Sequence, residues 1–291
     1  MGGMVTYRAR RIAVDGGELH VGQWGPDDGP TLVAVHGITA SHLAWAALAE
    51  AMPDVRIVAP DLRGRGQSSA LPGPWGMKRH ATDVAAVLSA VGPAVLVGHS
   101  MGAFVVNATA HLFPEKVRAV LLVDGGLTLD LPPGAMKDSA ADLLGPAAAR
   151  LEMTFAGWET YRQFWRAHPA LKDEWPPTMD AYVDYDLVGE PPAMRSRTSA
   201  DAMRQDAVEL YGTPLVDASV AGIRPDTTLL IAPRGLQNET PGLYSPAAIT
   251  RWHSVLPKLD VVEVDDVNHY TILMGERGAA VVAAYARALA G

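Results

Sequence analysis

The chain has 291 residues, of which 48% are hydrophobic and 19% are charged, and its formal net charge at pH 7 is −8. This length suffices for one large hydrophobic core, or for a core that carries an insertion. The acidic balance argues against nucleic acid as a partner, because no basic surface is predicted to neutralise phosphates. The absence of cysteine excludes disulfides, cysteine-based zinc sites and a cysteine nucleophile.

No targeting or membrane segment is predicted. Residues 1–11 lack the apolar stretch of a secretory signal, and the chain has no run of about 18 apolar residues. We therefore expect a cytoplasmic protein without a membrane partner.

The first predicted elements form a β-hairpin. Residues 7–14 and 18–25 alternate in part between apolar and polar side chains, and Asp15-Gly16-Gly17 between them is a strong turn signal. Apolar runs then alternate with helical patterns, which predicts an α/β fold with a mostly parallel sheet and helices on both faces. The predicted strands are 31–37, 55–62, 94–98 and 117–126, and the predicted helices are 42–53, 80–92 and 101–114.

This alternation stops near residue 127 and returns near residue 223. The stretch between them shows short helix-like pieces and little strand pattern. We expect a core of residues 1–126 and 223–291, with residues 127–222 inserted as a helical cap. In the returning part the predicted strands are 226–233 and 258–267, and the last helix is 276–290.

A candidate nucleophile lies between a predicted strand and a predicted helix. Gly98-His99-Ser100-Met101-Gly102 fits the pattern G-x-S-x-G, in which a strained turn presents the serine hydroxyl. The amide of Met101, the first of the helix, would point toward a developing oxyanion. The alternative is a Gly-Ser turn that only begins a helix.

The candidate base is His269. In this motif's fold the base follows the nucleophile and the acid along the chain, and only His253 and His269 lie in the returning α/β part. His253 falls within a helical pattern, whereas His269 follows the last predicted strand, where a loop at the sheet edge is expected. The alternative for His269 is a residue that caps the next helix.

Five segments together resemble the α/β-hydrolase superfamily, in its single-domain form with a helical cap. They are VHGITASHLAW, DLRGRGQS, VGHSMGAF, LLVDGG and VNHYTIL, and the resemblance covers residues 18–126 and 225–290. The resemblance implies that the amide of Ile38, after His36-Gly37, is the second oxyanion donor, with His36 itself structural. A serine nucleophile disfavours dehalogenase and epoxide hydrolase chemistry. The glycine-rich stretch 61–68 is a structural turn in this family and lacks the pattern of a phosphate loop.

The sequence leaves undecided which carboxylate completes a catalytic triad with Ser100 and His269. Most relatives carry an aspartate after the penultimate strand, but the expected position falls near Leu236. Asp124, at the end of the strand that follows the nucleophile, is the preferred candidate, and Glu239 is the alternative. Asp265 and Asp266 lie near His269 in sequence, but strand geometry is expected to point them away.

These residues predict a serine hydrolase that cleaves carboxylic esters of small to medium, largely apolar substrates through an acyl-enzyme. A lactonase or carbon–carbon bond hydrolase of the same fold is the alternative, and a non-catalytic ligand receptor is the alternative from another class. We expect no metal and no organic cofactor, and a monomer or homodimer. His42 and Trp45, near the oxyanion loop in sequence, are candidate substrate-binding residues.

Overall fold

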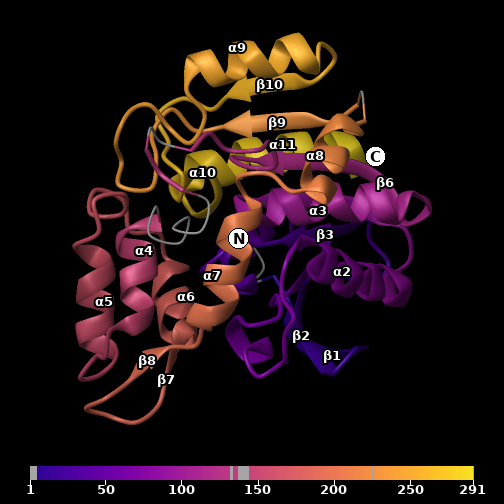
Figure 1. Cartoon of the computed structure of the whole chain (residues 1–291). Helices are drawn as coiled ribbons and strands as arrows, with labels where there is room; N and C mark the ends of the chain where they lie inside the picture. The colour runs from indigo at the N-terminus through magenta and orange to yellow at the C-terminus, as the bar shows by residue number, and fades with distance from the viewer. Residues whose placement is uncertain (1–4, 132–133, 137–143, 225, 291) are drawn as a thin grey trace.

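An eight-stranded sheet forms the centre of the computed structural model, which describes residues 5–131, 134–136, 144–224 and 226–290 (Figure 1). The strands lie in the order β1-β2-β4-β3-β5-β6-β9-β10. The pairs β1–β2 and β2–β4 are antiparallel, and every pair from β4 to β10 is parallel. The strands are β1 (Tyr7–Val14), β2 (Gly17–Trp24), β3 (Thr31–Val35), β4 (Arg56–Pro60), β5 (Ala94–His99), β6 (Val117–Val123), β9 (Thr228–Ile231) and β10 (Asp260–Glu263).

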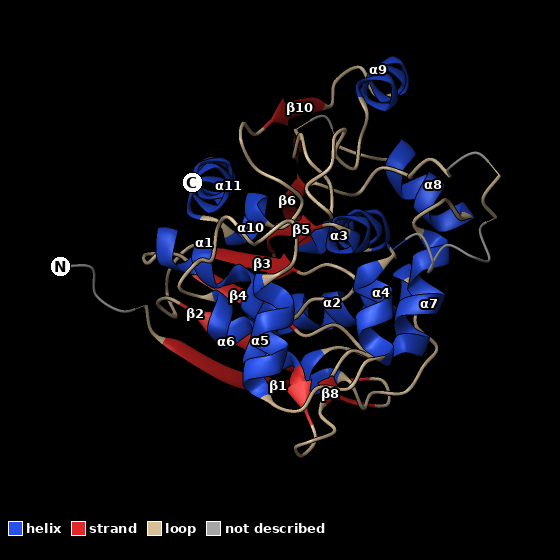
Figure 2. Cartoon of the chain, turned by 90° about the vertical axis from the view of Figure 1, so that its left-hand side faces the viewer, coloured by secondary structure: helices blue, strands red, loops and turns tan. Residues whose placement is uncertain are grey.

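Helices cover both faces of this sheet, as Figure 2 shows in a view onto the carboxyl ends of the parallel strands. The predicted α/β architecture is therefore confirmed. It arises because β3, β4 and β5 are apolar along their length, so both of their faces need cover. The helices are α1 (Ala46–Ala51), α2 (Met77–Val91), α3 (Met101–Leu112), α4 (Pro146–Ala149), α5 (Trp158–Arg166), α6 (Met179–Asp186), α7 (Ala200–Glu209), α8 (Pro214–Ala221), α9 (Pro246–Val255), α10 (Thr271–Met274) and α11 (Glu276–Ala290).

Each face of the sheet has its own hydrophobic core. On one face, α1, α10 and α11 pack against the strands, with Trp45 and Leu48 fully buried among them. On the other face, α2 and α3 pack against the sheet through residues such as Val84 and Val105. Because neighbouring side chains of a strand point to opposite faces, successive residues of β5 pack into different cores. Val95 joins the first core and Leu96 joins the second.

The segment between β6 and β9 holds α4 to α8 and a short antiparallel pair, β7 (Leu187–Val188) with β8 (Arg195–Ser196). In Figure 1, α4, α5 and α6 lie on the side to which the arrowheads of β9 and β10 point, which is the carboxyl edge of the sheet. Helix α8 differs from them. It packs on α3, and its Val216 and Val220 belong to the second core.

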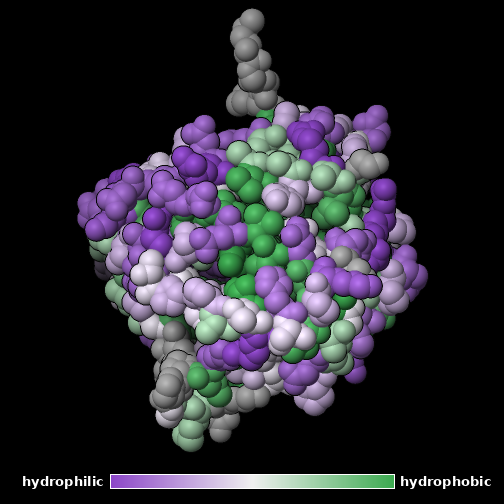
Figure 3. All heavy atoms as spheres, turned by 90° about the horizontal axis from the view of Figure 1, so that it is seen from above, coloured by the Kyte–Doolittle hydropathy of each residue, from purple (hydrophilic) through white to green (hydrophobic). Residues whose placement is uncertain are grey.

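The face of the molecule that carries α9 and β10 shows hydrophobic side chains gathered in its centre (Figure 3). Val255 at the end of α9 is 60% exposed. Within the described part of the chain, no helix combines the length and the apolar character that crossing a bilayer requires.

Candidate active site

Ser100 lies at a sharp turn between β5 and α3. Its backbone angles are φ 55° and ψ −125°, a region that non-glycine residues rarely adopt. The turn is held from both sides, because the amide of Ser100 donates to the carbonyl of Val123 at 2.9 Å and its carbonyl accepts from Ala103 at 3.0 Å. The strained geometry is that expected of the G-x-S-x-G motif.

The two motif glycines fit positions that admit no side chain. A Cβ on Gly98 would collide with the backbone of Gly102, and a Cβ on Gly102 would collide with the carbonyl of Val35. The start of α3 therefore lies directly against the ends of β5 and β3. This close approach brings Ser100 beside the loop that follows β3.

His269 and Asp124 form a buried pair. Nδ1 of His269 lies 2.6 Å from Oδ2 of Asp124, and the two residues are 4% and 0% exposed. The other carboxylate oxygen of Asp124 accepts a hydrogen bond at 3.1 Å from the amide of Ala232, at the end of β9. Both oxygens are thus held in place, and one of them orients the imidazole.

Asp124 occupies a strained position of its own. Its φ is 44°, and the next residue, Gly125, lies so close to Ser100 that a Cβ there would collide with the Ser100 carbonyl. β5 and β6 are parallel neighbours in the sheet, so their carboxyl ends lie side by side at the same edge. The sharp turn after Val123 points the Asp124 carboxylate toward β9 and the loop that carries His269.

The other carboxylates that the sequence left open lie elsewhere. Glu239 is exposed, and its side chain accepts from the amide of Gln237 at 2.6 Å within its own turn. Asp265 and Asp266 are also exposed, and Asp266 pairs with Arg234 at 3.3 Å. Among these four carboxylates, the structure brings Asp124 to His269.

The loop after β3 lies against Ser100. A Cβ on Gly37 would stand 3.1 Å from Cβ of Ser100 and 3.5 Å from its Oγ. The carbonyl of Gly37 bonds to Nδ1 of His36 at 2.8 Å and to the amide of Ala40 at 3.2 Å. Because a peptide unit is planar and trans, this fixes the direction of the Ile38 amide, which points opposite to the Gly37 carbonyl.

His36 holds this loop as a neutral imidazole. Its Nε2 accepts from the amide of Leu62 at 3.0 Å, so Nδ1 carries the proton and donates to Gly37. Complete burial lowers the pKa of His36 to about 4, which keeps this tautomer at neutral pH. The histidine therefore orients the loop and does not line the pocket.

One pocket contains Ser100, His269 and both of the expected oxyanion residues, Ile38 and Met101. Most of its wall is apolar, and much of the wall comes from residues that the sequence did not single out. Tyr270 could have been suspected from its position next to His269, but the others are set by the fold. The further lining residues are Thr39, Ala40, His99, Phe104, Leu129, Leu144, Ala147, Tyr182, Leu210, Leu236, Leu243, Tyr270 and Met274.

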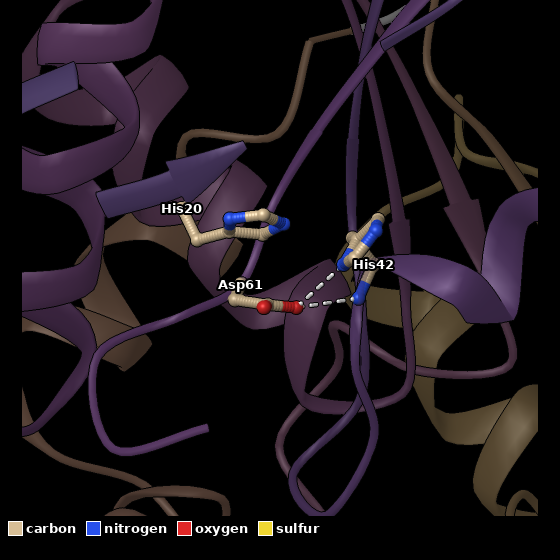
Figure 4. A group of neighbouring side chains, drawn as sticks. All are labelled: His20, His42 and Asp61. Atoms are coloured by element: carbon tan, nitrogen blue, oxygen red, sulfur yellow. Dashed lines mark hydrogen bonds and ion pairs between the residues drawn. The ribbon is translucent and has the colours of Figure 1, made fainter. Parts of the chain in front are cut away.

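The structure does not bring His42 or Trp45 to this pocket. Trp45 is fully buried in the core beside α1. His42 is also fully buried, and Asp61 accepts from its backbone amide and from Nδ1, each at 2.9 Å. These contacts hold the ring beside Asp61 and near His20 (Figure 4).

His20, His42 and Asp61 are also the described residues whose ligand atoms could approach one metal ion, all lying within 4.8 Å of one another. Both ring nitrogens of His42 and both oxygens of Asp61 have partners within the protein, whereas the buried Nε2 of His20 has none among the described residues. One Asp61 oxygen serves His42, and the other accepts from Tyr185 and from the amide of Gln67. The group therefore fits a buried hydrogen-bond network better than a metal centre.

Comparison with known proteins identifies the family. Residues 32–284 match the model of the alpha/beta hydrolase family. The chain belongs to this family. In this fold, Ser100 and His269 line one pocket, and Asp124 contacts His269 from behind it.

Individual relatives include several kinds of hydrolase. Lipase LipV of Mycobacterium tuberculosis is 32% identical over 182 residues, which cover 60% of this chain and 64% of that protein. The matches to the first curated relatives thus span less than two thirds of those proteins' own length. The 2-(acetamidomethylene)succinate hydrolase of Mesorhizobium japonicum is 28% identical over 91% of this chain and 89% of its own.

Solved structures show the same fold. A thioesterase domain from the curacin biosynthetic pathway superposes with a TM-score of 0.77 at 21% identity, covering 97% of this chain and 99% of that one. The crystal structure of E-2-(acetamidomethylene)succinate hydrolase gives a TM-score of 0.76 at 22% identity, covering 96% and 99%.

Proposed function

We propose that this hydrolase-family protein cleaves carboxylic esters of small to medium, largely apolar substrates through an acyl-enzyme. Ser100 is the proposed nucleophile, His269 the base and Asp124 the acid. The amides of Ile38 and Met101 are the proposed oxyanion hole. The observation that carries the proposal is the buried contact of 2.6 Å between Asp124 and His269, because His269 lines the same pocket as the strained Ser100.

In the proposed cycle, Nε2 of His269 takes the proton of the Ser100 hydroxyl while Oγ attacks the ester carbonyl. Asp124 holds the imidazole with its proton on Nδ1 and stabilises the cation that forms. The imidazolium then protonates the departing alcohol, and a water molecule, activated by the same histidine, hydrolyses the acyl-enzyme. These steps use only groups of the chain and water.

The oxyanion that forms on the attacked carbonyl would accept from two backbone amides. Removing one oxyanion donor in other enzymes costs about 10²–10³-fold in kcat. Backbone donors are held by the fold, and here His36 fixes the peptide of Ile38 while the start of α3 fixes that of Met101. Both donors would therefore be oriented before the substrate binds.

The preference for an apolar substrate follows from the pocket wall. Leucines from both sides line it, including Leu129 and Leu210 from the inserted segment and Leu236 and Leu243 from the loop after β9. Pockets of this kind bind by burying apolar surface, with a few polar groups for orientation. The similarity to a lipase supports an ester as the substrate.

Two measurements test the proposal. A fluorophosphonate probe should label wild-type protein and leave Ser100→Ala unlabelled. p-Nitrophenyl esters of increasing acyl length should be hydrolysed by wild type and not by Ser100→Ala. If folded wild-type protein is neither labelled nor active on any ester, the protein is not an ester hydrolase and the receptor alternative gains support.

A lactonase or carbon–carbon bond hydrolase remains the second candidate. The similarity to a 2-(acetamidomethylene)succinate hydrolase, which extends over 91% of this chain, supports a substrate other than a simple ester. A panel of lactones beside the esters separates the two. If a lactone is hydrolysed with a kcat/KM above that of every ester, the lactonase becomes the preferred function and the ester hydrolase the second candidate.

A further inference from the structure

Two buried arginine side chains hold consecutive carbonyls of the oxyanion loop. Nε of Arg65 donates to the carbonyl of Ile38 at 2.9 Å, and Nη2 of Arg150 donates to the carbonyl of Thr39 at 3.2 Å. The two arginines are 0% and 1% exposed. They approach the loop from parts of the chain that are far apart in sequence.

Arg65 is anchored to α7 of the inserted segment. Its Nη1 lies 2.5 Å from Oδ2 of Asp206, which is fully buried. The same carboxylate accepts from Nε2 of His80 at 2.9 Å and from the amide of Gly76 at 2.6 Å. Asp206 is therefore fixed by several donors, and it fixes Arg65 in turn.

Arg150 belongs to the inserted segment itself and is anchored to the end of α6. Its Nη1 pairs with Asp186 and also contacts Tyr161 and Ser196, the last at 3.0 Å. The guanidinium lies 5.0 Å from the ring centre of Trp165. Nη1 of Arg150 thus donates to partners within the segment 127–222, while Nη2 donates to the oxyanion loop, residues 37–40.

The direction of a carbonyl fixes the direction of the amide in the same peptide plane. In the turn 37–40, the carbonyl of Gly37 is held by the turn itself and by His36. The next two carbonyls are held by Arg65 and Arg150. The peptide plane that carries the amide of Ile38 and the two planes that follow it therefore have fixed partners, and the two arginines among these partners are held by carboxylates of the inserted segment.

We propose that Arg150, together with Arg65, is a positioning residue that couples the segment 127–222 to the oxyanion amide of Ile38. The inference rests on the proposed function. By this coupling, the inserted segment helps to position an oxyanion donor, in addition to lining the pocket. A defect in this coupling should weaken binding of the tetrahedral state and leave ground-state binding nearly intact, because neither arginine lines the pocket.

The test is the double variant Arg150→Met/Asp186→Asn. It removes both charges together, so no buried charge is left without its partner. The matched control is Arg162→Met/Asp184→Asn, which removes another arginine–aspartate pair between α5 and α6. The control pair is about one-third exposed, and no contact joins it to the oxyanion loop among the described hydrogen bonds.

Three quantities are measured for each protein: kcat and KM on a p-nitrophenyl ester, the inhibition constant of a trifluoromethyl ketone, and the unfolding temperature. A misplacement of about 1 Å can cost about 10²-fold, and loss of a whole oxyanion donor costs about 10²–10³-fold. We expect kcat of the Arg150 variant to fall by about 10- to 100-fold, with KM changed less than about threefold. The hydroxyl of Ser100 adds to the carbonyl of this ketone and forms a tetrahedral adduct. The affinity for the ketone should therefore fall in parallel with kcat.

The outcomes are distinct. Wild-type kcat in the folded Arg150 variant, or an equal loss in the Arg162 control, would overturn the inference and leave the proposed function standing. Turnover by Ser100→Ala would overturn the proposed function itself. If the double variant does not fold, Arg150→Lys decides, because an ammonium beside Asp186 keeps the ion pair but lacks the second arm of the fork. Wild-type kcat in Arg150→Lys would then refute the coupling.

Discussion

Replacing Asp124 by asparagine tests the assignment of the acid most directly. The substitution keeps the shape of the side chain. Its amide oxygen can still accept the hydrogen bond from Ala232, which now measures 3.1 Å. The other arm changes from an acceptor to an NH₂ group facing Nδ1 of His269, where the acceptor now lies at 2.6 Å.

An NH₂ group in that place favours the imidazole tautomer with its proton on Nε2. This tautomer cannot take the proton of the Ser100 hydroxyl, since Nε2, the nitrogen proposed to receive that proton, is already protonated. In a serine protease the equivalent substitution leaves the geometry intact and lowers kcat by about 10⁴-fold. We expect a loss of the same order here, about 5.5 kcal/mol in the activation free energy at 1.36 kcal/mol per tenfold change.

The assay is steady-state hydrolysis of a p-nitrophenyl ester, with thermal unfolding to show that each variant is folded. Glu239→Gln is the matched control, because Glu239 is exposed and contacts only its own turn among the described hydrogen bonds. The control should keep kcat within about twofold, as expected of a surface substitution. An active Asp124→Asn together with an inactive Glu239→Gln would refute the assignment.

Three further outcomes concern stability. Burial lowers the pKa of His36 to about 4, so between about pH 6.5 and 4 the unfolded chain binds more protons than the folded one. The free energy of unfolding should therefore fall as pH drops through this window, by up to about 1.4 kcal/mol per unit, and denaturant titrations that show no pH dependence there would contradict this. Gly125→Ala should be destabilised by about 3 kcal/mol or more, since the new methyl group collides with the backbone of Ser100, and a melting temperature equal to that of wild type would contradict the collision. Asp83→Asn, which leaves the buried Arg63 without its ion pair at 3.0 Å, should cost about 3–5 kcal/mol in urea unfolding, and a loss below 1 kcal/mol would show that the pair is solvated.

Local patterns predicted much of the fold. The apolar runs at β3, β4 and β5 are buried as expected, because a strand covered on both faces has to be apolar along its length. The serine motif could be placed at a strand-to-helix turn because the apolar run before it and the helical pattern after it are both local in sequence. Helix α8 shows the limit of such patterns. It lies within the predicted cap range, but its valines meet α3, a contact that only the folded chain defines.

The side-chain partners needed distances that no sequence pattern supplies. The pairing of Asp124 with His269 depends on the ends of β6 and β9 being neighbours and on the turn after Val123. His42 and Trp45 were expected near the substrate because they follow the oxyanion loop. Asp61, nineteen positions along the chain, bonds to His42, which does not line the pocket. These contacts join distant segments, so short-range patterns could not predict them.

The position of Asp124 directly after β6 has a consequence for how the proposed substrate preference could change. The usual position that the family resemblance implies for the acid is the loop after the penultimate strand, and an acid there would require that loop to keep one length and one path. Here Leu236 and Leu243 of the same loop line the pocket, while the proposed acid is attached to a strand in the middle of the sheet. Substitutions at Leu236 and Leu243 can therefore alter which acyl groups fit without replacing a residue of the proposed triad. The backbone of this loop is less free to change, because the carbonyl of Arg234 accepts from the amide of His269 at 3.0 Å. In evolutionary terms, selectivity can vary through these two side chains while the chemistry is kept, and a library confined to the two positions is the natural way to redesign the specificity.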